Sequence, residues 1–398
     1  MRAGLPGTAR LAAAGLVIGL GVVLAGCGTS HPGAASVGVP TTTGTVSPTS
    51  SPTTTSTTPA GQAVPSGFVP LSFTAISASD YWVLGSVPCA SGRCTAILRT
   101  TDGGGSFSSI PAPELQNVGA PGSEVTLRYA DHDDGFAFVT GEGGVVYATH
   151  DGGASWHLLE LRSLIAFATG GGYVDAVTAQ CTPDRCADFR LARSPVSRDT
   201  WTSTAMPFTP DGAVLDLSAH GANIWLLGTR AGEVATRYDL LARSTDAGRT
   251  FVVGDGPCFP GLGGELAPSS ARVVWAVCPT GMMAGAARST DKGVTFAPLR
   301  TPLGLVNSAL LAPASDTTAM LIRNGASAPP LETTDAGTTW TTPATPARAT
   351  FWSWVGFTDA EAGAALVQTR YDAAAGVETQ QLWRTTDGGS SWRNVPFR

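Results

Sequence analysis

Charged side chains are scarce in this sequence, and one of the two common basic residues is almost missing. Only 14% of the 398 residues are charged, and Lys292 is the single lysine. The formal net charge of −6 argues against a nucleic-acid partner, because neutralising phosphates requires a basic surface. Long helices rich in Glu, Lys and Arg are also disfavoured. Beyond the first 27 residues, no apolar run is long enough to cross a membrane.

Residues that interrupt regular backbone structure are abundant instead. The chain contains 49 glycines and 28 prolines, together with many Thr, Ser and Val residues. Thr and Val favour strands, whereas Gly, Pro and Ser favour turns. The composition therefore predicts an all-β protein with short strands and many turns.

The N-terminal segment predicts export. Arg2 and Arg10 form a short basic region, and an apolar run follows from Leu11 to Ala25. This arrangement is typical of a secretory signal peptide. The run ends in Leu24-Ala25-Gly26-Cys27, which resembles the lipobox of bacterial lipoproteins. The resemblance implies that residues 1–26 are removed and that Cys27 carries the lipid, which anchors the protein to the outside of the cell membrane. The alternative is an ordinary signal peptide with a chance cysteine.

Residues 27–66 predict a disordered tether. The stretch is rich in Thr, Ser and Pro, and it has no aromatic or charged side chain after Cys27. Such a segment cannot bury enough apolar surface to offset the entropy of ordering it. Its composition suits either O-glycosylation or a plain spacer. Residues 67–398 are left as the folded domain.

One eight-residue pattern recurs along the folded domain. It consists of a hydroxyl residue, any residue, Asp, any residue, Gly, two further residues and an aromatic. A degenerate copy runs from Ser194 to Trp201, with Val196 and Arg198 at the Asp and Gly positions. The six other copies contain Asp102 with Phe107, Asp151 with Trp156, Asp246 with Phe251, Asp291 with Phe296, Asp335 with Trp340, and Asp387 with Trp392.

The spacing of the copies predicts the architecture. Successive Asp positions lie 49, 45, 50, 45, 44 and 52 residues apart when Val196 stands for the degenerate copy. The 332 residues of the domain thus divide into seven units of about 47 residues. A period of this length with four short strands per unit is typical of a β-propeller. The expected fold is a seven-bladed β-propeller of four-stranded antiparallel blades, with the pattern between the third and fourth strands.

The pattern resembles the Asp-box (BNR) repeat of sialidases, the sortilin receptor domain and photosystem II assembly-factor-like propellers. The resemblance covers all seven units and concerns architecture rather than chemistry. In a tight turn, an Asp carboxylate can accept backbone N–H bonds, Gly can adopt a positive φ, and the aromatic can pack between sheets. The resemblance implies that the boxes lie away from the ligand site, so the six Asp residues are expected to be structural.

Six cysteines remain after Cys27, and an even number in an exported protein predicts disulfides. Two pairs straddle hairpins between second and third strands, and the third pair brackets the first two strands of the fifth unit. All three pairs are expected at the end of the propeller opposite the boxes. A four-cysteine zinc site is the alternative for the two short pairs, although their spacing is long for zinc. The pairs are Cys89 with Cys94, Cys181 with Cys186, and Cys258 with Cys278.

The sequence offers no catalytic constellation, and no catalytic residue is assigned. Phe68-Val69-Pro70 stands where sialidases carry an Arg-x-Pro element, and Arg300-Thr301-Pro302 lies between later units. A glycosidase needs two carboxylates about 5–9.5 Å apart. Candidates by proximity alone, with solvated turn residues as the alternative, are Asp131, Asp133, Asp134 and Glu142. No metal site or cofactor is expected, because no metal-ligand spacing links His132, His150, His157 and His220.

The disulfides indicate either a ligand face at their end of the propeller or stabilisation of the hairpins alone. Trp352 and Trp354 lie on the first strand of the seventh unit, where aromatics could stack on a sugar or grip a peptide; inter-blade packing is the alternative. Arg237, Arg370 and Tyr371 lie in long second-to-third loops of the same end. The predicted function is non-enzymatic binding of a protein partner or a cell-envelope glycan by a monomer. An exo-acting, sialidase-like glycosidase is the alternative.

Overall fold

The computed structural model describes the chain from Gln62 to Arg398, except for residues 91, 117, 119–124, 142, 162, 183–184, 231–238, 260–261, 281–282, 302–307, 325–328, 346–348, 350 and 373–376. The signal segment, Cys27 and most of the predicted tether lie outside the described residues. Gln62 already contacts the domain, since its carbonyl accepts the N–H of Ser109 at 2.8 Å. Within the described residues, no helix has the length and apolarity needed to span a membrane.

The described chain forms seven antiparallel sheets, here called blades 1 to 7 in chain order. Blade 1 consists of β1 (Val69–Ala75), β2 (Tyr81–Cys89), β3 (Gly92–Thr100) and β4 (Ser108–Ile110). Blade 2 consists of β5 (Val125–Tyr129), β6 (Gly135–Val139), β7 (Val146–Thr149) and β8 (His157–Leu159). Blade 3 consists of β9 (Leu164–Gly170), β10 (Tyr173–Thr182), β11 (Arg185–Pro195) and β12 (Thr202–Ala205).

The second half of the chain repeats this arrangement. Blade 4 consists of β13 (Pro210–His220), β14 (Asn223–Arg230), β15 (Leu240–Ser244) and β16 (Val252–Asp255). Blade 5 consists of β17 (Glu265–Pro268), β18 (Val274–Pro279), β19 (Ala284–Ser289) and β20 (Ala297–Pro298). Blade 6 consists of β21 (Ser308–Pro313), β22 (Ala319–Asn324) and β23 (Leu331–Thr333), with an isolated bridge from Glu332 to Thr341 where a fourth strand would lie. Blade 7 consists of β24 (Phe351–Phe357), β25 (Gly363–Asp372), β26 (Val377–Thr385) and β27 (Arg393–Val395).

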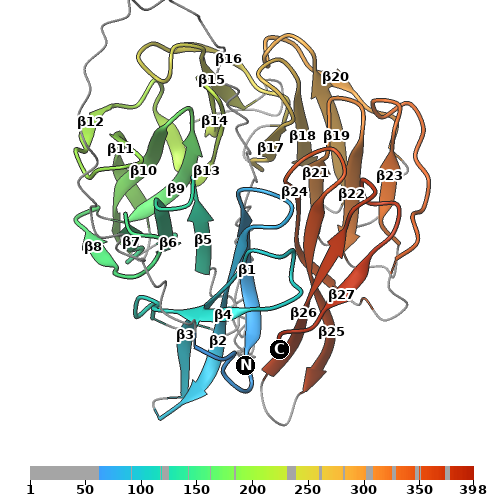
Figure 1. Ribbon diagram of the computed structural model, residues 1–398. Coiled ribbons are helices and arrows are strands. Elements are labelled where there is room, and N and C mark those ends of the chain that lie inside the picture. Colours follow the sequence, from blue (N-terminus) through green and yellow to red (C-terminus); the bar gives the residue numbers. More distant parts are fainter. Residues whose placement is uncertain are drawn as a thin grey trace, which may run out of the picture.

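The blades follow one another around a ring, so the predicted seven-bladed propeller is confirmed. In Figure 1 the colours run from blue through green and yellow to red around the ring, and the blue and red blades lie side by side. Strands in every sheet are consecutive in the chain, so the ring closes without exchanging a strand. Side chains close it instead: Phe73 and Tyr81 of blade 1 share an apolar cluster with Trp354 and Leu382 of blade 7.

The core is divided among the spaces between blades. Alternating side chains of a strand point to opposite faces of its sheet, so every blade presents one apolar face to each neighbour. The seven apolar clusters each combine buried residues of two neighbouring blades. Between blades 1 and 2, for example, the rings of Trp82 and Tyr129 stack with centroids 3.9 Å apart. The domain therefore depends on seven small cores rather than on one.

Polar side chains join neighbouring inner strands, whose edges would otherwise leave backbone groups unpaired. Ser72 of β1 accepts the N–H of Leu127 of β5 on its Oγ at 2.9 Å. Asn324 of β22 accepts the N–H of Trp352 at 3.0 Å and donates to the carbonyl of the same residue at 2.8 Å. These bonds hold β1 of blade 1 against β5 of blade 2, and β22 of blade 6 against β24 of blade 7.

Candidate functional site

The ring has two ends that differ in how their loops are held. One end, here called the box end, carries the turns between first and second strands and those between third and fourth strands. These turns bond to each other: the N–H of Gly152 donates to the carbonyl of Asp133 at 3.0 Å, and Lys292 donates to Arg272 at 2.8 Å. The other end, here called the stapled end, carries the hairpins between second and third strands and the connections between blades.

The recurring Asp side chains are occupied within their own turns at the box end. In blade 2, Asp151 Oδ1 accepts the Thr149 hydroxyl at 2.7 Å and the Ser155 N–H at 2.9 Å. The Ser155 hydroxyl donates to Oδ2 at 2.6 Å. Bonds of the same kind from Ser106 hold the pKa of Asp102 well below its ordinary value. These bonds perform the turn-building role that the sequence predicted for the pattern.

The aromatic residues of the pattern complete the same turns from the core side. Each of the six contacts one of the inter-blade clusters, and Phe107 is itself buried within one. In the degenerate turn of blade 3, Ser194 keeps the hydroxyl position, and its Oγ accepts the N–H of Thr200 at 3.0 Å. The box end is therefore held by local bonds and by the cores beneath it.

Three disulfides tie the loops of the stapled end. They join Cys89 to Cys94 between β2 and β3, Cys181 to Cys186 between β10 and β11, and Cys258, in the connection between β16 and β17, to Cys278 at the end of β18. The predicted pairing is confirmed, and the alternative of a four-cysteine zinc site is wrong because these sulfurs are bonded to each other.

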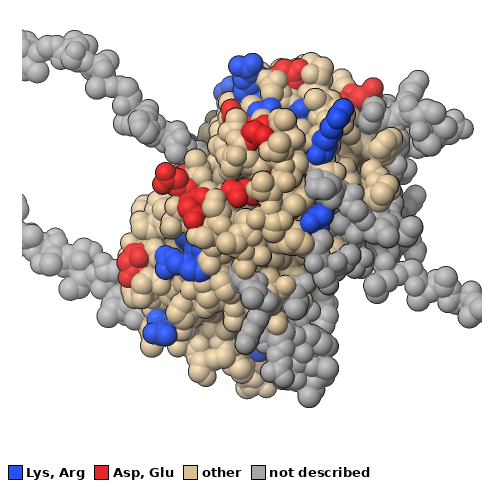
Figure 2. Space-filling model, turned by 90° about the vertical axis from the view of Figure 1, so that its right-hand side faces the viewer, with Lys and Arg blue, Asp and Glu red and all other residues tan. Residues whose placement is uncertain are grey.

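Exposed apolar side chains gather beside the third disulfide. Phe259 and Leu262 lie in the connection that leads into β17, and Met283 ends the turn between β18 and β19. Their exposed fractions are 52%, 45% and 51%, respectively. The Cys258–Cys278 bond joins the connection to the end of β18. The three residues are here called the blade 5 patch. Figure 2, which shows the side of blades 5 to 7, has scattered Asp/Glu and Lys/Arg side chains of both signs on an otherwise uncharged surface.

The two tryptophans proposed for the ligand face are buried, which is a correction. Trp352 is 4% exposed and packs between blades 6 and 7, and Trp354 is 8% exposed and packs between blades 7 and 1. They lie on opposite faces of β24 although they are two positions apart, because the register with β25 shifts between them and interrupts the strand's alternation. Their neighbour Phe351, at the first position of the strand, is 39% exposed. Inter-blade packing therefore accounts for both indole rings.

Other sequence candidates are only partly placed. Arg370 and Tyr371 lie on β25, paired in register with Thr379 and Glu378, and their side chains are outside the described residues. Arg237 lies outside the described residues altogether. The sequence prediction that these side chains face a ligand therefore stays a prediction.

The clustered carboxylates of blade 2 lie in the turn between β5 and β6, at the box end. Asp131 Oδ1 accepts the N–H groups of Asp133 and Asp134 at 3.0 and 2.8 Å, so it caps its own turn. Asp134 is buried, and its Oδ1 lies 2.7 Å from His150 Nδ1. Glu142 lies outside the described residues. Asp131 is therefore an exposed turn residue, as the alternative stated, whereas Asp134 lies in the same turn but is buried rather than solvated.

Two carboxylates that the sequence analysis did not single out lie on neighbouring inner strands. Asp216 of β13 accepts the N–H of Leu266 of β17 at 2.9 Å. Burial raises the pKa of Asp216 to about 7. Burial, and next the charge of Asp216, raise the pKa of Glu265 well above its ordinary value. The sequence signal was a single acidic residue within each apolar strand, Leu215-Asp216-Leu217 and Glu265-Leu266-Ala267.

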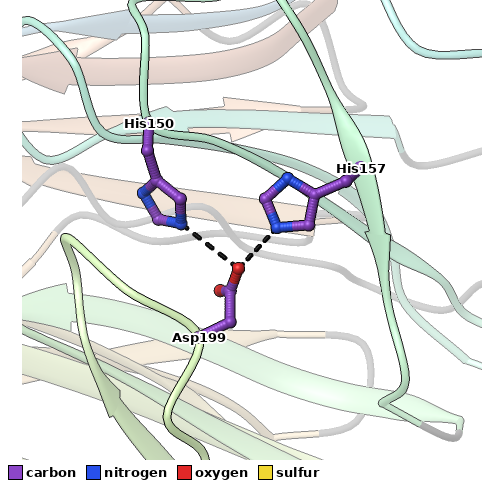
Figure 3. A group of neighbouring side chains, drawn as sticks. All are labelled: His150, His157 and Asp199. Atoms are coloured by element: carbon purple, nitrogen blue, oxygen red, sulfur yellow. Dashed lines mark hydrogen bonds and ion pairs between the residues drawn. The ribbon is translucent and has the colours of Figure 1, made fainter.

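A second missed group combines two blades. His150 Nε2 lies 3.2 Å from Asp199 Oδ2, and His157 Nε2 lies 2.5 Å from the same oxygen (Figure 3). The two histidines are seven positions apart and flank the box turn of blade 2. A histidine directly before the box Asp and another directly after the box aromatic was the signal available in the sequence. The third member, Asp199, comes from the degenerate turn of blade 3.

No protein-family model matches this chain, and no curated protein matches it by sequence. Solved structures share its fold. YCF48 from Cyanidioschyzon merolae is 13% identical, with 82% of this chain and 98% of that chain covered and a TM-score of 0.53. For the β-propeller domain of the Trilobed protease from Pyrococcus furiosus, the identity is 8%, the coverage 83% and 98%, and the TM-score 0.54.

A further structure, a puromycin-hydrolyzing peptidase from Mycobacterium tuberculosis, is 11% identical with a TM-score of 0.54. The alignment covers 83% of this chain and 53% of the peptidase, so this chain corresponds to about half of that protein. At such identities the likeness shows the propeller fold alone. The same scaffold occurs in proteins of different kinds, so function must be argued from the surface.

Proposed function

We propose that this protein is a non-enzymatic binding propeller that holds a protein partner at its stapled end. The blade 5 patch carries the proposal. Its Phe, Leu and Met side chains are each close to half exposed, although side chains of these types are usually buried in propellers and other folded domains. Where such side chains form one exposed apolar patch, the patch is typical of an interaction site.

The position of the patch also favours binding. The Cys258–Cys278 bond and the hydrogen bond from Thr280 N–H to the Met283 carbonyl, at 2.8 Å, hold its two loops. Loops that are held by cross-links lose less entropy when a partner binds. At the box end, by contrast, a box carboxylate such as that of Asp151 is already bonded within its own turn. The stapled end is therefore the better-prepared surface.

The chemistry of the patch indicates what it would contact. Methionine and phenylalanine adapt to apolar partners, and methionine can also contact aromatic rings. We infer that the partner presents an apolar segment rather than a charged one. The signal segment and Cys27 place the protein, in this proposal, at the outer side of the cell membrane, where the Thr/Ser/Pro-rich segment lets the propeller reach an envelope protein.

Binding should be tested on the full-length protein in its own cells. Cross-linking in intact cells identifies a candidate partner, and its affinity is then measured by calorimetry for wild type and for Met283→Ser and Phe259→Ser. We expect each substitution to weaken binding at least tenfold. Val294→Ser is the matched control, because Val294 is 55% exposed but lies in a turn of the box end. Equal affinity for all three variants would refute the proposal.

Two further outcomes separate the alternatives. Turnover of an aryl-glycoside panel that is abolished by Asp216→Asn or Glu265→Gln would replace the binding function with the glycosidase alternative. A glycan that binds the stapled end without turnover would change the partner from protein to glycan.

The lipid anchor is tested separately. Cys27→Ala should move the protein from the membrane fraction to the soluble fraction; an unchanged distribution would contradict lipid attachment at Cys27.

A further inference from the structure

The cluster of His150, His157 and Asp199 presents ligand atoms that are typical of a metal site. One ring nitrogen from each histidine and one carboxylate oxygen all lie within 4.8 Å of one another. Figure 3 shows both rings directed toward the carboxylate from the opposite side of the seam between blades 2 and 3. Two imidazoles and one carboxylate are a common ligand set for first-row divalent metals.

The box turn of blade 2 fixes the two histidines. His150 lies between Thr149 and Asp151, which are joined by a hydrogen bond of 2.7 Å. His157 begins β8, directly after the aromatic residue of the same turn. The two imidazole centroids are 5.6 Å apart. The cluster therefore stands on a turn whose geometry is already determined by its own hydrogen bonds.

The third group comes from the one turn that has lost the repeated pattern. In blade 3, Val196 replaces the box Asp, and the Ser194 hydroxyl donates to the Arg198 carbonyl at 2.5 Å instead. Asp199 follows and faces blade 2. The residues at the equivalent position of the other six turns carry no carboxylate: Gly105, Ala154, Arg249, Val294, Thr338 and Ser390. The departure of blade 3 from the repeat thus supplies an acidic group at this seam.

Asp134 orients one of the rings. Its Oδ1 lies 2.7 Å from His150 Nδ1, and Asp134 is 6% exposed. A carboxylate that accepts the Nδ1–H of a histidine leaves the lone pair on Nε2, which is the nitrogen that faces Asp199. Metal-binding histidines commonly have such a carboxylate behind them. Asp134 would therefore act as a positioning residue and not as a ligand.

We propose that His150 Nε2, His157 Nε2 and Asp199 together bind a divalent first-row metal ion, with Zn²⁺ as the expected ion in an exported protein. Ligand atoms about 2.0–2.1 Å from a tetrahedral Zn²⁺ lie about 3.3 Å apart. The 3.2 Å separation of His150 and Asp199 matches this value, and the shorter His157–Asp199 separation must open by less than 1 Å. The side chain of His157 is 49% exposed, which leaves it room to rotate.

The arrangement leaves space for a fourth ligand. The cluster lies at the surface, with the Asp199 side chain 26% exposed, so water can complete a tetrahedral set. The bound ion would join blade 2 to blade 3 at the box end. This site is independent of the stapled end and does not rest on the proposed partner binding.

The test uses the full-length protein without a polyhistidine tag, purified with its disulfides intact. Calorimetric titration with Zn²⁺ should give saturable binding of one ion, reversed by a chelator, and a higher thermal unfolding midpoint. We expect Asp199→Asn and His157→Ala each to weaken Zn²⁺ binding at least tenfold. Asp134→Asn should weaken it by tenfold to a hundredfold.

His132→Gln is the matched control. His132 is an exposed histidine of the same end, and its Nδ1 pairs with Asp80 at 3.1 Å, outside the cluster. Zn²⁺ affinity unchanged in this variant but lost in Asp199→Asn would support the site. Absence of saturable binding to wild type, equal binding by Asp199→Asn, or an equal loss in His132→Gln would overturn it and leave only His–Asp ion pairs. Circular dichroism confirms that each variant is folded.

Discussion

At the box end one turn is repeated with little change, whereas the connections of the stapled end differ in length. The hairpin between β2 and β3 spans two residues after Cys89, but the chain between β14 and β15 runs from Arg230 to Leu240. The repeated turns satisfy their polar groups within eight residues of sequence. The stapled end instead has three disulfides, of which two close single hairpins and one joins a connection to the end of β18. Because each box turn satisfies its own polar groups, the same eight residues can recur in blade after blade. Because disulfides hold the stapled end, its connections can differ in length.

The two ends of the ring also differ in which side chains are available to bind a ligand. A box turn that keeps its Asp has no spare carboxylate, since both oxygens are bonded. In blade 3 the loss of that Asp coincides with a carboxylate directed at the neighbouring blade. At the stapled end, Phe259, Leu262 and Met283 are not part of a repeated turn, and their side chains are exposed. Four predictions, from the largest expected effect to the smallest, test this comparison.

The disulfide of blade 5 should matter most. Cys258→Ala with Cys278→Ala opens a link between residues 20 positions apart, and it removes two buried side chains. We expect a loss of about 3 kcal/mol in the free energy of unfolding. The pair Cys89 and Cys94, five positions apart, should cost about 2 kcal/mol when replaced in the same way. Urea unfolding of both double variants measures the difference, and an equal or reversed order would contradict it.

The closing contact of the ring at the box end comes next. Arg384 is 2% exposed, donates from Nη2 to the Ala78 carbonyl at 2.9 Å, and lies over the ring of Tyr81. Arg384→Ala should therefore lower the free energy of unfolding by about 2 kcal/mol. Arg288→Ala is the control, because Arg288 makes the corresponding bond to Asp316 between blades 5 and 6 but is more exposed. A larger loss for Arg288→Ala than for Arg384→Ala would contradict this prediction.

The inner strands, which run between the two ends, should make stability depend on pH. The pKa of Asp216 is about 7 in the folded protein, because burial raises it from about 3.9 in the unfolded chain. Between these values the folded protein holds a proton that the unfolded chain has released, so stability is highest at low pH within the window. We expect the free energy of unfolding to fall by about 1–2 kcal/mol from pH 5 to pH 7 through this group.

Asp216→Asn isolates that effect, because the amide oxygen can still accept the N–H of Leu266. Urea unfolding at a series of pH values should show a smaller decrease between pH 5 and pH 7 for the variant than for wild type. An identical slope in both proteins would assign the pH dependence to other groups, Glu265 among them.

The smallest effect concerns the backbone of the box turns. Ala336 adopts a φ of +64° at a position where blade 1 has Gly103 with a φ of +72°. Ala336→Gly should raise the free energy of unfolding by up to about 1 kcal/mol, since glycine adopts positive φ without strain. Gly103→Ala should have the opposite sign, because the added Cβ meets nothing closer than 3.8 Å and only the backbone is tested. Thermal unfolding midpoints decide the signs.

The fold could be predicted because its information is repeated and local. The spacing of the Asp residues gave the number of blades, and each turn depends on residues within a few positions of its Asp. The pairing of Cys89 with Cys94 was predictable for the same reason. The third pair, Cys258 with Cys278, followed once the unit boundaries were known.

The candidate sites could be predicted less well, because they depend on which face of a strand points where. Trp352 and Trp354 are suitable in type for a ligand surface, but the two faces of β24 place both in cores. The environment of Asp216 could not be predicted from the sequence either, since it depends on the contact of β13 with β17. Composition could not distinguish an exposed aromatic from a buried one.

The sequence by itself determined the all-β class, the seven units and the chemistry of the turns, because these follow from composition, period and neighbouring residues. Tertiary structure alone decided that His150, His157 and Asp199 meet, since Asp199 belongs to another blade. It also decided that Phe259, Leu262 and Met283 form a surface rather than a core. Both outcomes depend on how blades pack around the ring, and no local pattern encodes the distance across a seam.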